Sequence, residues 1–332
     1  MSRDGEARIG GIDVGGTWTV AVVVDPAGRL LGRARRATVG TDGDRIVDGA
    51  AEALRSALQD AGGGDVVAAG MGVPGQVDPV AGTVRLALNL GLDGGEVPVG
   101  ALLRQRLGRP VTVENDVRAA ALGAYDHLRV EMPDVRSVAY LSIGTGIAAG
   151  FVRDGEVHRG RAGMAGEIGH VVVLEDGPAC RCGLRGCLEA VAAGPAIGEM
   201  WPGRDDRPAE AMLAAAADGD PSARRLVEEV VGRYVLAIQW LATAWGPDLI
   251  ALGGGIGSVG EPLLGPLRER LAALAKVSEL ARVLVPTERI VSIPPEVPAG
   301  ALGAAALAHR SIGTEIGKRI DVDSGEPSGR GE

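Results

Sequence analysis

All three cysteines of the 332-residue chain fall in one short segment, Cys180-Arg181-Cys182-Gly183-Leu184-Arg185-Gly186-Cys187. Random placement would scatter them, so this clustering indicates a metal site. A structural Zn²⁺ ion takes four sulfur or nitrogen ligands in a closed tetrahedron, and His170, a short way upstream, offers the fourth. We therefore predict a structural zinc ion bound by His170, Cys180, Cys182 and Cys187. A disulfide and a set of three inert thiols are the alternatives.

A carboxylate followed by a glycine turn lies near the start of the chain. Asp13 stands at the end of an apolar run, and Gly15-Gly16-Thr17 follows it. Glycines let backbone amides approach an anion closely, and the hydroxyl of Thr17 adds a further donor. This pattern is typical of a phosphate site, with Asp13 placed to hold Mg²⁺ directly or through water. The alternative is an ordinary hairpin.

Two further glycine turns follow predicted strands, Gly144-Thr145-Gly146 and Gly253-Gly254-Gly255. Three such turns at strand ends are hard to explain by packing alone, and they favour a bound nucleotide. A fourth segment, Glu114-Asn115-Asp116, ends a short strand and opens a helix. Asp116 fits a helix N-cap. It equally fits a base that accepts a proton from a hydroxyl during phosphoryl transfer.

Composition and charge exclude several classes of protein. The chain has 34 basic and 43 acidic residues, a formal charge of −9, which disfavours nucleic-acid binding. No signal-peptide core and no stretch of about 18 uncharged apolar residues occurs, so we expect a cytoplasmic protein without membrane contact. The lysines, Lys276 and Lys318, follow no glycine-rich turn, which excludes a Walker-type phosphate loop and the strand lysine of protein kinases.

The predicted elements form two similar halves of an α/β protein, each with a strand, a glycine turn and a hairpin followed by helices. We expect a smaller domain over 1–115, a larger domain over 116–299 that carries the zinc site, a closing helix over about 300–312 that packs back on the smaller domain, and a flexible tail over 313–332. The two turns at Gly15 and Gly144 are expected to face one another across a cleft. A single irregular α/β domain is the alternative.

These motifs resemble those of the superfamily of sugar kinases, actin and heat-shock ATPases. Asp13-Val14-Gly15-Gly16-Thr17 and Gly144-Thr145-Gly146 are similar to its two phosphate motifs, and Leu252-Gly253-Gly254-Gly255 to its adenosine motif. Glu167-Ile168-Gly169-His170, together with Cys-x-Cys-Gly-x-x-Gly-Cys-x-Glu, resembles the signature of the ROK family (repressors, open reading frames, kinases). The resemblance spans roughly residues 8 to 310.

The resemblance implies a two-lobed actin-like ATPase (ribonuclease H-like) fold with an interlobe cleft and a glucokinase-like activity. ATP with Mg²⁺ would phosphorylate a hexose hydroxyl, expected to be the one on carbon 6. Asp116 would be the base, and a homodimer or homotetramer is implied. The residues that the resemblance assigns to the sugar are Gly75, Asn89, Asn115, Asp116, Glu167, His170 and Glu189.

Departures from the family pattern leave the sugar open. Trp18 stands where relatives often have lysine, Ala148 replaces a usual glycine, Ala124 replaces a frequent glutamate, and Leu92-Asp93-Gly94-Gly95 lacks the usual tryptophan. The alternatives are a kinase for an amino or N-acetyl hexose (glucosamine, kanosamine, N-acetylglucosamine or N-acetylmannosamine) and a catalytically silent sugar-binding regulator. A DNA-binding repressor is not expected, because seven residues precede Arg8.

Overall fold

The computed structural model of the protein describes residues 7–40, 42–92, 94–203, 207–285 and 287–323. The chain divides into two compact units, which we call the first and second units. The first unit holds the residues up to Ala119 together with those from Gly300 onward, and the second unit is Ala120–Ala299. Helix α3 (Asp116–Glu131) begins in the first unit and continues into the second.

The first unit is built on a five-stranded sheet in the order β3-β2-β1-β4-β7. Strands β1 to β3 form an antiparallel meander, and β4 and β7 join β1 in parallel. Short apolar runs separated by turn residues account for most of these strands, and β2 is the richest in β-branched residues. Their bounds are β1 Ile9–Val14, β2 Trp18–Val24, β3 Leu30–Ala37, β4 Ala68–Val73 and β7 Val111–Asn115, with a small separate hairpin of β5 Gln76–Asp78 and β6 Thr83–Arg85.

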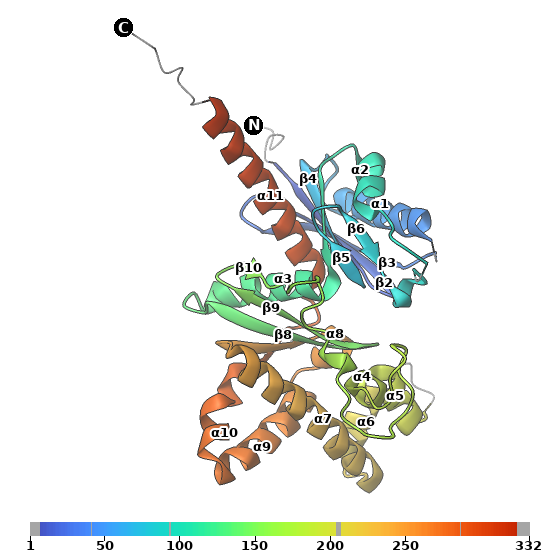
Figure 1. The fold of residues 1–332 in the computed structure, drawn as a ribbon, viewed down its shortest axis with the longest axis vertical. Coiled ribbons are helices and arrows are strands. Elements are labelled where there is room, and N and C mark those ends of the chain that lie inside the picture. The colour runs from blue at the N-terminus through green and yellow to red at the C-terminus, as the bar shows by residue number, and fades with distance from the viewer. Residues whose placement is uncertain (1–6, 41, 93, 204–206, 286, 324–332) are drawn as a thin grey trace. The chain divides into compact units, whose positions relative to one another are not determined.

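Helices cover both faces of this sheet (Figure 1). Helices α1 (Gly43–Asp60) and α2 (Val99–Leu107) pack on one face, where Ile12, Val14 and Leu54 belong to a single buried cluster. Helix α11 (Ala299–Asp323) lies on the other face, against Ile9, Val22, Val24 and Ala68. The sheet is therefore the middle layer of three, and alternate residues of each strand face α11.

Glycines allow α11 to lie very close to the sheet. A Cβ atom added at Gly70 would stand 1.8 Å from the carbonyl oxygen of Ala304, and one added at Gly11 would stand 2.0 Å from that of Ala301. No real Cβ contact is that short, so the helix and the strands can meet only because these side chains are absent. The packing of α11 thus depends on the bare backbone of β1 and β4.

The second unit repeats the same sheet. Its strand order β10-β9-β8-β11-β12 has the same sequence of antiparallel and parallel pairs as the first sheet. The internal repetition that the sequence indicated is therefore present. The bounds are β8 Ser137–Ile143, β9 Ile147–Arg153, β10 Glu156–Val157, β11 Leu249–Gly253 and β12 Ile290–Ser292.

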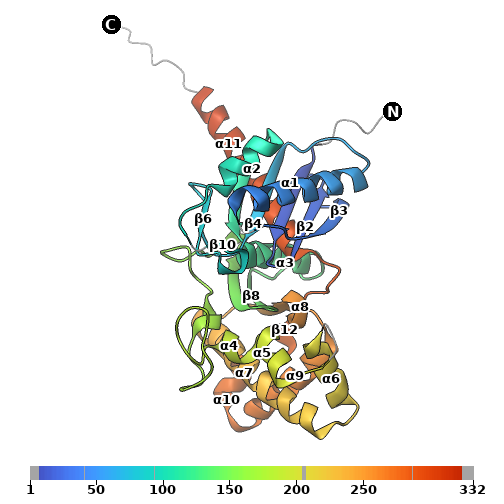
Figure 2. The same cartoon turned by 90° about the vertical axis from the view of Figure 1, so that its right-hand side faces the viewer.

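Helices of the second unit pack against this sheet in one large buried cluster, and α7 is the longest of them (Figure 2). A break at Asp218-Gly219-Asp220 separates α6 from α7. The bounds are α4 Leu188–Ala192, α5 Gly194–Met200, α6 Pro208–Ala217, α7 Pro221–Trp245, α8 Gly254–Gly257, α9 Glu261–Val277 and α10 Glu279–Leu284, with short 3₁₀ turns at Leu88–Leu90, Ile168–His170 and Thr287–Arg289.

The C-terminal helix is longer than predicted. We expected it to end near residue 312 with a flexible tail from 313, but α11 runs to Asp323. Residues 314–323 contain no proline and one glycine, so nothing in their sequence forces the helix to stop. The rest of the predicted tail, 324–332, lies outside the described residues. In the part of the chain that is described, no helix has the length and apolarity needed to cross a bilayer.

Replacing Gly70 by alanine should lower the melting temperature of the protein, because the new methyl group would overlap the backbone of α11. Overpacking of this kind costs about 1–3 kcal/mol or more. Thermal unfolding followed by circular dichroism measures the effect. The matched control is Gly49→Ala in α1, where an added Cβ meets nothing within 4 Å; it should be neutral or stabilise by up to about 1 kcal/mol. Equal melting temperatures for the two variants would show that the close approach of α11 is unimportant.

Candidate functional site

Asp13 and Asp116 both lie next to Gly72, where the parallel strands of the first sheet end. A Cβ atom added at Gly72 would be 3.3 Å from the Cα of Asp116 and 3.7 Å from Oδ1 of Asp13. Desolvation, together with the nearby charge of Asp116, raises the pKa of Asp13 from 3.8 to about 7. Two acidic groups held this close favour a proton or a metal cation between them.

Helix α11 contributes to this acidic pair through Gly300, in its first turn. A Cβ atom there would be 2.3 Å from Oδ2 of Asp13, so the absence of a side chain leaves room for the carboxylate. Sequence reasoning missed both Gly300 and Gly72. Nothing in the local sequence marks them, because their importance comes from contacts with residues far along the chain.

The sequence left open whether Asp116 caps helix α3, and the structure gives that role to its neighbour. Oδ1 of Asn115 accepts hydrogen bonds from the backbone N–H groups of Val117 and Arg118, both at 3.1 Å. Asp116 is the first residue of the helix. Its carboxylate is therefore not needed as a cap.

A buried ion pair fixes the strand-to-helix turn that carries these residues. Glu114 and Arg118 are each 1% exposed, and Oε1 of Glu114 lies 2.9 Å from Nε of Arg118. The same oxygen accepts a hydrogen bond from the backbone N–H of Asn115. Sequence reasoning did not single out Arg118, although the spacing of four residues from Glu114 at a helix start was a usable signal.

The other predicted residues of the first unit gather at the same end of the sheet. Nδ2 of Asn115 donates to the carbonyl oxygen of Gly75, which has a φ of 99°. Asn89, in the turn Leu88–Leu90, lies beside Gly16: a Cβ added to this glycine would be 3.5 Å from the Cβ of Asn89. Gly75, Asn89, Asn115 and Gly16 therefore belong to one cluster with the acidic pair.

The glycine turn of the first unit is held by a residue that we did not predict. Oγ1 of Thr38 donates to the carbonyl oxygen of Gly15, and the backbone N–H of Thr38 donates to that of Thr17. Gly16 and Thr17 remain exposed. Their backbone amide and hydroxyl groups can therefore meet an anionic ligand, while Thr38 holds the turn in place.

In the second unit the two remaining glycine turns lie together. A Cβ atom at Gly144 would be 3.5 Å from the backbone nitrogen of Gly255, and one at Gly254 would be 2.6 Å from the carbonyl oxygen of Ile143. Thr145 and Gly255 are exposed, and Gly146 is half-buried. Gly253 is buried against the ring of Tyr140, so its missing side chain serves packing.

A cavity of about 1290 Å³ in the second unit reaches the turn that contains Gly255. Gly255 and Ser258 line it, together with Ser292, Pro294 and residues of α6, α7 and α9. It is larger than the roughly 300–1000 Å³ of a typical small-molecule site. The third glycine turn is therefore placed beside a hollow that is wide enough for a nucleoside.

Glu189 supports the glycine turn of the second unit. Its Oε2 atom accepts a hydrogen bond of 3.0 Å from the backbone N–H of Ile147, and a Cβ atom at Gly146 would come within 2.5 Å of the same oxygen. Sequence reasoning assigned Glu189 to the sugar. Its contacts here show that one carboxylate oxygen is used by the turn.

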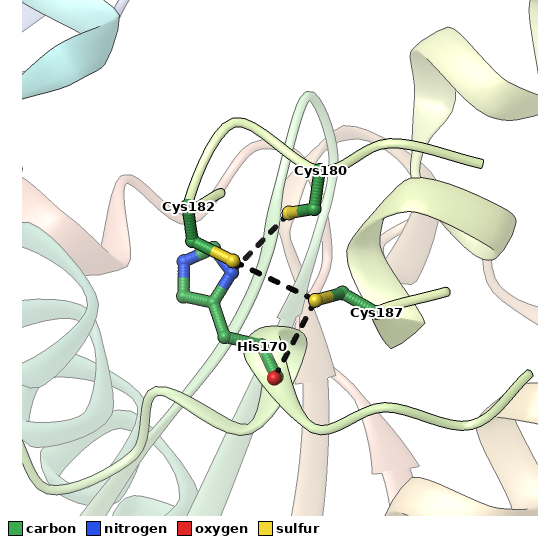
Figure 3. Close-up of side chains that lie close together, drawn as sticks. All are labelled: His170, Cys180, Cys182 and Cys187. Atoms are coloured by element: carbon green, nitrogen blue, oxygen red, sulfur yellow. Dashed lines mark hydrogen bonds between the residues drawn. The ribbon is translucent and has the colours of Figure 1, made fainter. Parts of the chain in front are cut away.

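Three cysteines and His170 form a compact cluster, as the sequence predicted (Figure 3). Their ligand atoms all lie within 4.8 Å of one another, with Sγ of Cys180 at 3.6 Å from Nδ1 of His170 and Sγ of Cys182 at 3.6 Å from that of Cys187. All three are free cysteines, so the disulfide alternative is not supported. These separations match a tetrahedron of ligands about 2.0–2.3 Å from a zinc ion.

Without a bound cation, the surroundings of Cys187 disfavour its thiolate form. Desolvation and the neighbouring thiols raise the pKa of Cys187 to about 12. A cation would reverse this effect, because metal ligation requires the thiolate. The other ring nitrogen of His170, Nε2, lies 3.9 Å from Oε2 of Glu167. The cluster therefore orients His170 and leaves its second nitrogen beside Glu167.

Close backbone packing holds this loop on strand β9. Cβ atoms at Gly166 and Gly169 would lie 1.8 Å and 1.9 Å from the carbonyl oxygens of Ala149 and Ile147. The amide of Ala149 also donates to the carbonyl oxygen of Gly166 at 2.7 Å. Glu167 and His170 are thus fixed by glycine contacts on one side and by the cysteine cluster on the other.

Comparisons with known proteins agree with this architecture. The model of the ROK family matches residues 9–311. The chain belongs to the ROK family. A Thermotoga maritima glucokinase is 33% identical over 330 residues, which cover 91% of this chain and 98% of that protein. The family resemblance that the sequence motifs indicated is therefore confirmed.

A solved structure and a second relative extend the comparison. The ROK family glucokinase from Streptomyces griseus in complex with glucose and AMPPNP has a TM-score of 0.75 and 32% identity, covering 92% of this chain and all of that one (100%). An N-acetylmannosamine kinase from Vibrio cholerae is 34% identical over 161 residues, 48% of this chain and 55% of that protein. The predicted α/β fold of the actin-like ATPase class is confirmed for this ROK chain.

Replacing Asp13 by asparagine should stabilise the metal-free protein at pH 8 and have little effect at pH 4. The folded-state pKa of Asp13 lies above its unfolded value, so the stability that its protonated form provides is complete below about pH 4 and is lost as the pH rises through about 7. The difference is at most about 4 kcal/mol, since one pKa unit corresponds to about 1.4 kcal/mol.

Melting temperatures at the two pH values, with a chelator present, measure this effect. Asp134→Asn, which removes an exposed carboxylate from the second unit, is the control and should show no such pH dependence. If Asp13→Asn raised the melting temperature equally at both pH values, the desolvated acidic pair would not be the cause.

Proposed function

We propose that this ROK protein phosphorylates a hexose with ATP, in the manner of a glucokinase. The acidic pair of Asp13 and Asp116 beside a fixed glycine turn is the observation that carries the proposal. The glucokinase relative that spans nearly the whole chain supports it, as does the related structure with glucose and AMPPNP. Phosphoryl transfer needs mainly positioning and charge neutralisation, and the described residues offer both.

Asp116 is the proposed base. It would accept the proton of the hexose hydroxyl as that oxygen bonds to the γ-phosphorus and the bond to the bridging oxygen of ADP breaks. Asp116 is the first residue of α3, whereas Asp13 has its pKa raised to about 7 by desolvation and by the charge of Asp116. The two neighbouring carboxylates are proposed to have separate roles, Asp116 as base and Asp13 as metal ligand.

Asp13 is the proposed holder of Mg²⁺, which would neutralise charge on the β- and γ-phosphates when bound. The raised pKa fits this role, because a divalent cation offsets the repulsion that disfavours the ionised pair. Gly15, Gly16 and Thr17 are proposed to bind phosphate oxygens. In the second unit, Gly144, Thr145 and Gly146 are proposed for phosphate, and Gly253, Gly254 and Gly255 for adenosine.

Sugar recognition is proposed for both units. Gly75, Asn89, Asn115 and Asp116 come from the first unit, and Glu167, His170 and Glu189 from the second. Carboxylates and amides suit a polyol, since each hydroxyl both donates and accepts. Asn115 and Glu189 already make hydrogen bonds to the backbone. Their proposed part is therefore as much to fix neighbouring groups as to contact the sugar.

A kinase for an amino or N-acetyl hexose is the second candidate. The segment after Asn89 departs from the pattern expected for a glucose site, and the N-acetylmannosamine kinase relative matches about half of the chain. A coupled assay with ATP and Mg²⁺ over glucose, glucosamine, kanosamine, N-acetylglucosamine and N-acetylmannosamine separates the two. Turnover of none of these sugars by folded protein would favour the silent sugar-binding regulator.

Replacing Asp116 by asparagine should lower kcat by roughly 10²–10⁴-fold, the usual contribution of a positioned base. The affinity for the sugar should change by no more than a few-fold, because Asn has the same shape as Asp. Steady-state kinetics and calorimetric titration with the sugar measure the two quantities. Asp126→Asn, an exposed residue in the same helix, is the control. Retained turnover in Asp116→Asn would remove its assignment as base.

We further propose that the cysteine cluster binds structural zinc, and that metal removal weakens sugar binding before it weakens ATP binding. The proposed sugar ligands Glu167 and His170 share the loop that the cluster fixes. His170→Asn should lose zinc, and the dissociation constant for the sugar should rise about tenfold or more. Metal analysis and titrations with the sugar and AMPPNP test this. The control is His309→Asn, in an exposed position on α11. An equal loss of AMPPNP affinity would contradict the local role.

A further inference from the structure

An arginine and a tryptophan form a stacked pair beside the glycine turn of the first unit. The guanidinium carbon of Arg35 lies 4.0 Å from the centre of the Trp18 ring. Trp18 directly follows Thr17 and is 45% exposed, and Arg35 is also exposed. A guanidinium over the face of an indole is attracted by the negative face of the ring, which restricts an otherwise flexible side chain. The pair therefore holds a positive charge in a defined place at the surface.

The strand register puts this charge on the same face of the sheet as Asp13. Asp13 in β1 pairs with Val20 in β2, and Val20 pairs with Arg35 in β3, so the three form one cross-strand row. Neighbouring strands are about 4.8 Å apart, which places the backbone of Arg35 about 10 Å from that of Asp13. Trp18 shares this face with Val20, and it pulls the guanidinium toward the end of β2 that begins at the glycine turn.

The adjacent arginine is arranged differently. Arg36 pairs with Thr19 and faces the side of the sheet that α1 covers. Its Nη2 atom lies 3.1 Å from Oε2 of Glu52, and Nη1 lies 3.3 Å from Oγ of Ser56. Two consecutive arginines of β3 thus lie on opposite faces of the sheet. Arg36 forms an ion pair with α1, whereas Arg35 stacks on the uncharged ring of Trp18. A cation stacked on a ring keeps its N–H edges available to an anion.

We propose that Arg35 and Trp18 form an anion subsite beside the turn Gly15–Thr17, which takes a phosphate group of the phosphoryl donor. This inference rests on the proposed kinase function. Arg35 would donate N–H bonds to phosphate oxygens, for which the planar guanidinium is well suited. Trp18 is a positioning residue, because it fixes the guanidinium before the donor arrives and so lowers the cost of ordering it.

Such a contact should affect binding of the donor rather than the chemical step. Arg35→Gln should raise the KM for ATP and the dissociation constant for AMPPNP about tenfold, with kcat within about twofold of wild type. Trp18→Ala should raise both constants about threefold, since the charge remains but is no longer held. Higher salt should reduce the difference between wild type and Arg35→Gln, because exposed charges are screened.

Steady-state kinetics with saturating sugar, together with calorimetric titration with AMPPNP, make the test. Arg36→Gln is the matched control: it removes the same charge from the next residue of the strand, and its KM for ATP should stay near that of wild type. Trp18→Lys in the Arg35→Gln background should bring the KM for ATP back to within about threefold of wild type, because an ammonium then stands next to Thr17. Melting temperatures establish that each variant is folded.

The outcomes separate this inference from the function on which it rests. If the wild-type protein phosphorylates a sugar but Arg35→Gln and Arg36→Gln give the same KM for ATP, the subsite is wrong and the kinase function stands. A fall in kcat at unchanged KM would also overturn it. If the wild type turns over no sugar, the kinase function fails, and unchanged AMPPNP affinity in Arg35→Gln would then remove the subsite as well.

Discussion

The desolvation of Asp13 beside a second carboxylate is the constraint on which the first unit depends. Asp13 and Asp116 come from different parts of the chain, and the ends of β1 and β7 bring them next to Gly72. Desolvation, together with the charge of the neighbouring Asp116, raises the pKa of Asp13 to about 7. A fold that keeps such a pair must spend stability on it, as proteins commonly do at functional sites. Three features hold these two groups in place. Asn115 caps α3, Glu114 pairs with Arg118, and Gly300 leaves room for the carboxylate of Asp13.

The same architecture occurs twice and is used differently each time. Both sheets have a hairpin followed by two parallel strands, and in both a glycine turn joins the first two strands. In the first unit the turn is fixed by Thr38 and lies beside acidic side chains. In the second it is fixed by Glu189 and lies beside a second glycine turn and a cavity. Repetition of a sheet thus supplies two glycine turns in different surroundings, acidic side chains in the first unit and a cavity in the second.

Much of the fold and the outline of the site could be predicted from the sequence, because the decisive signals are local. Period-two apolar runs, glycine turns at strand ends and cysteines crowded into one segment each report on a few consecutive residues. The cluster of His170, Cys180, Cys182 and Cys187 was predicted residue by residue for this reason. What could not be predicted depends on distant contacts: the role of Gly300 exists only because α11 packs beside Asp13, and that of Thr38 only because β3 lies beside the turn. The choice between Asn115 and Asp116 as helix cap needed coordinates, since both residue types cap helices well.

The position of every cysteine in a single cluster has a consequence for the chemistry of the whole molecule. Since no thiol of this chain lies elsewhere, every reaction of a cysteine thiol with an oxidant or an alkylating agent takes place in this cluster. Cys182 is exposed, whereas Cys180 and Cys187 are buried, so attack would begin at one sulfur and proceed only as the loop opens. Oxidation of these thiols would remove the proposed metal ligands and so act directly on the loop that carries Glu167 and His170.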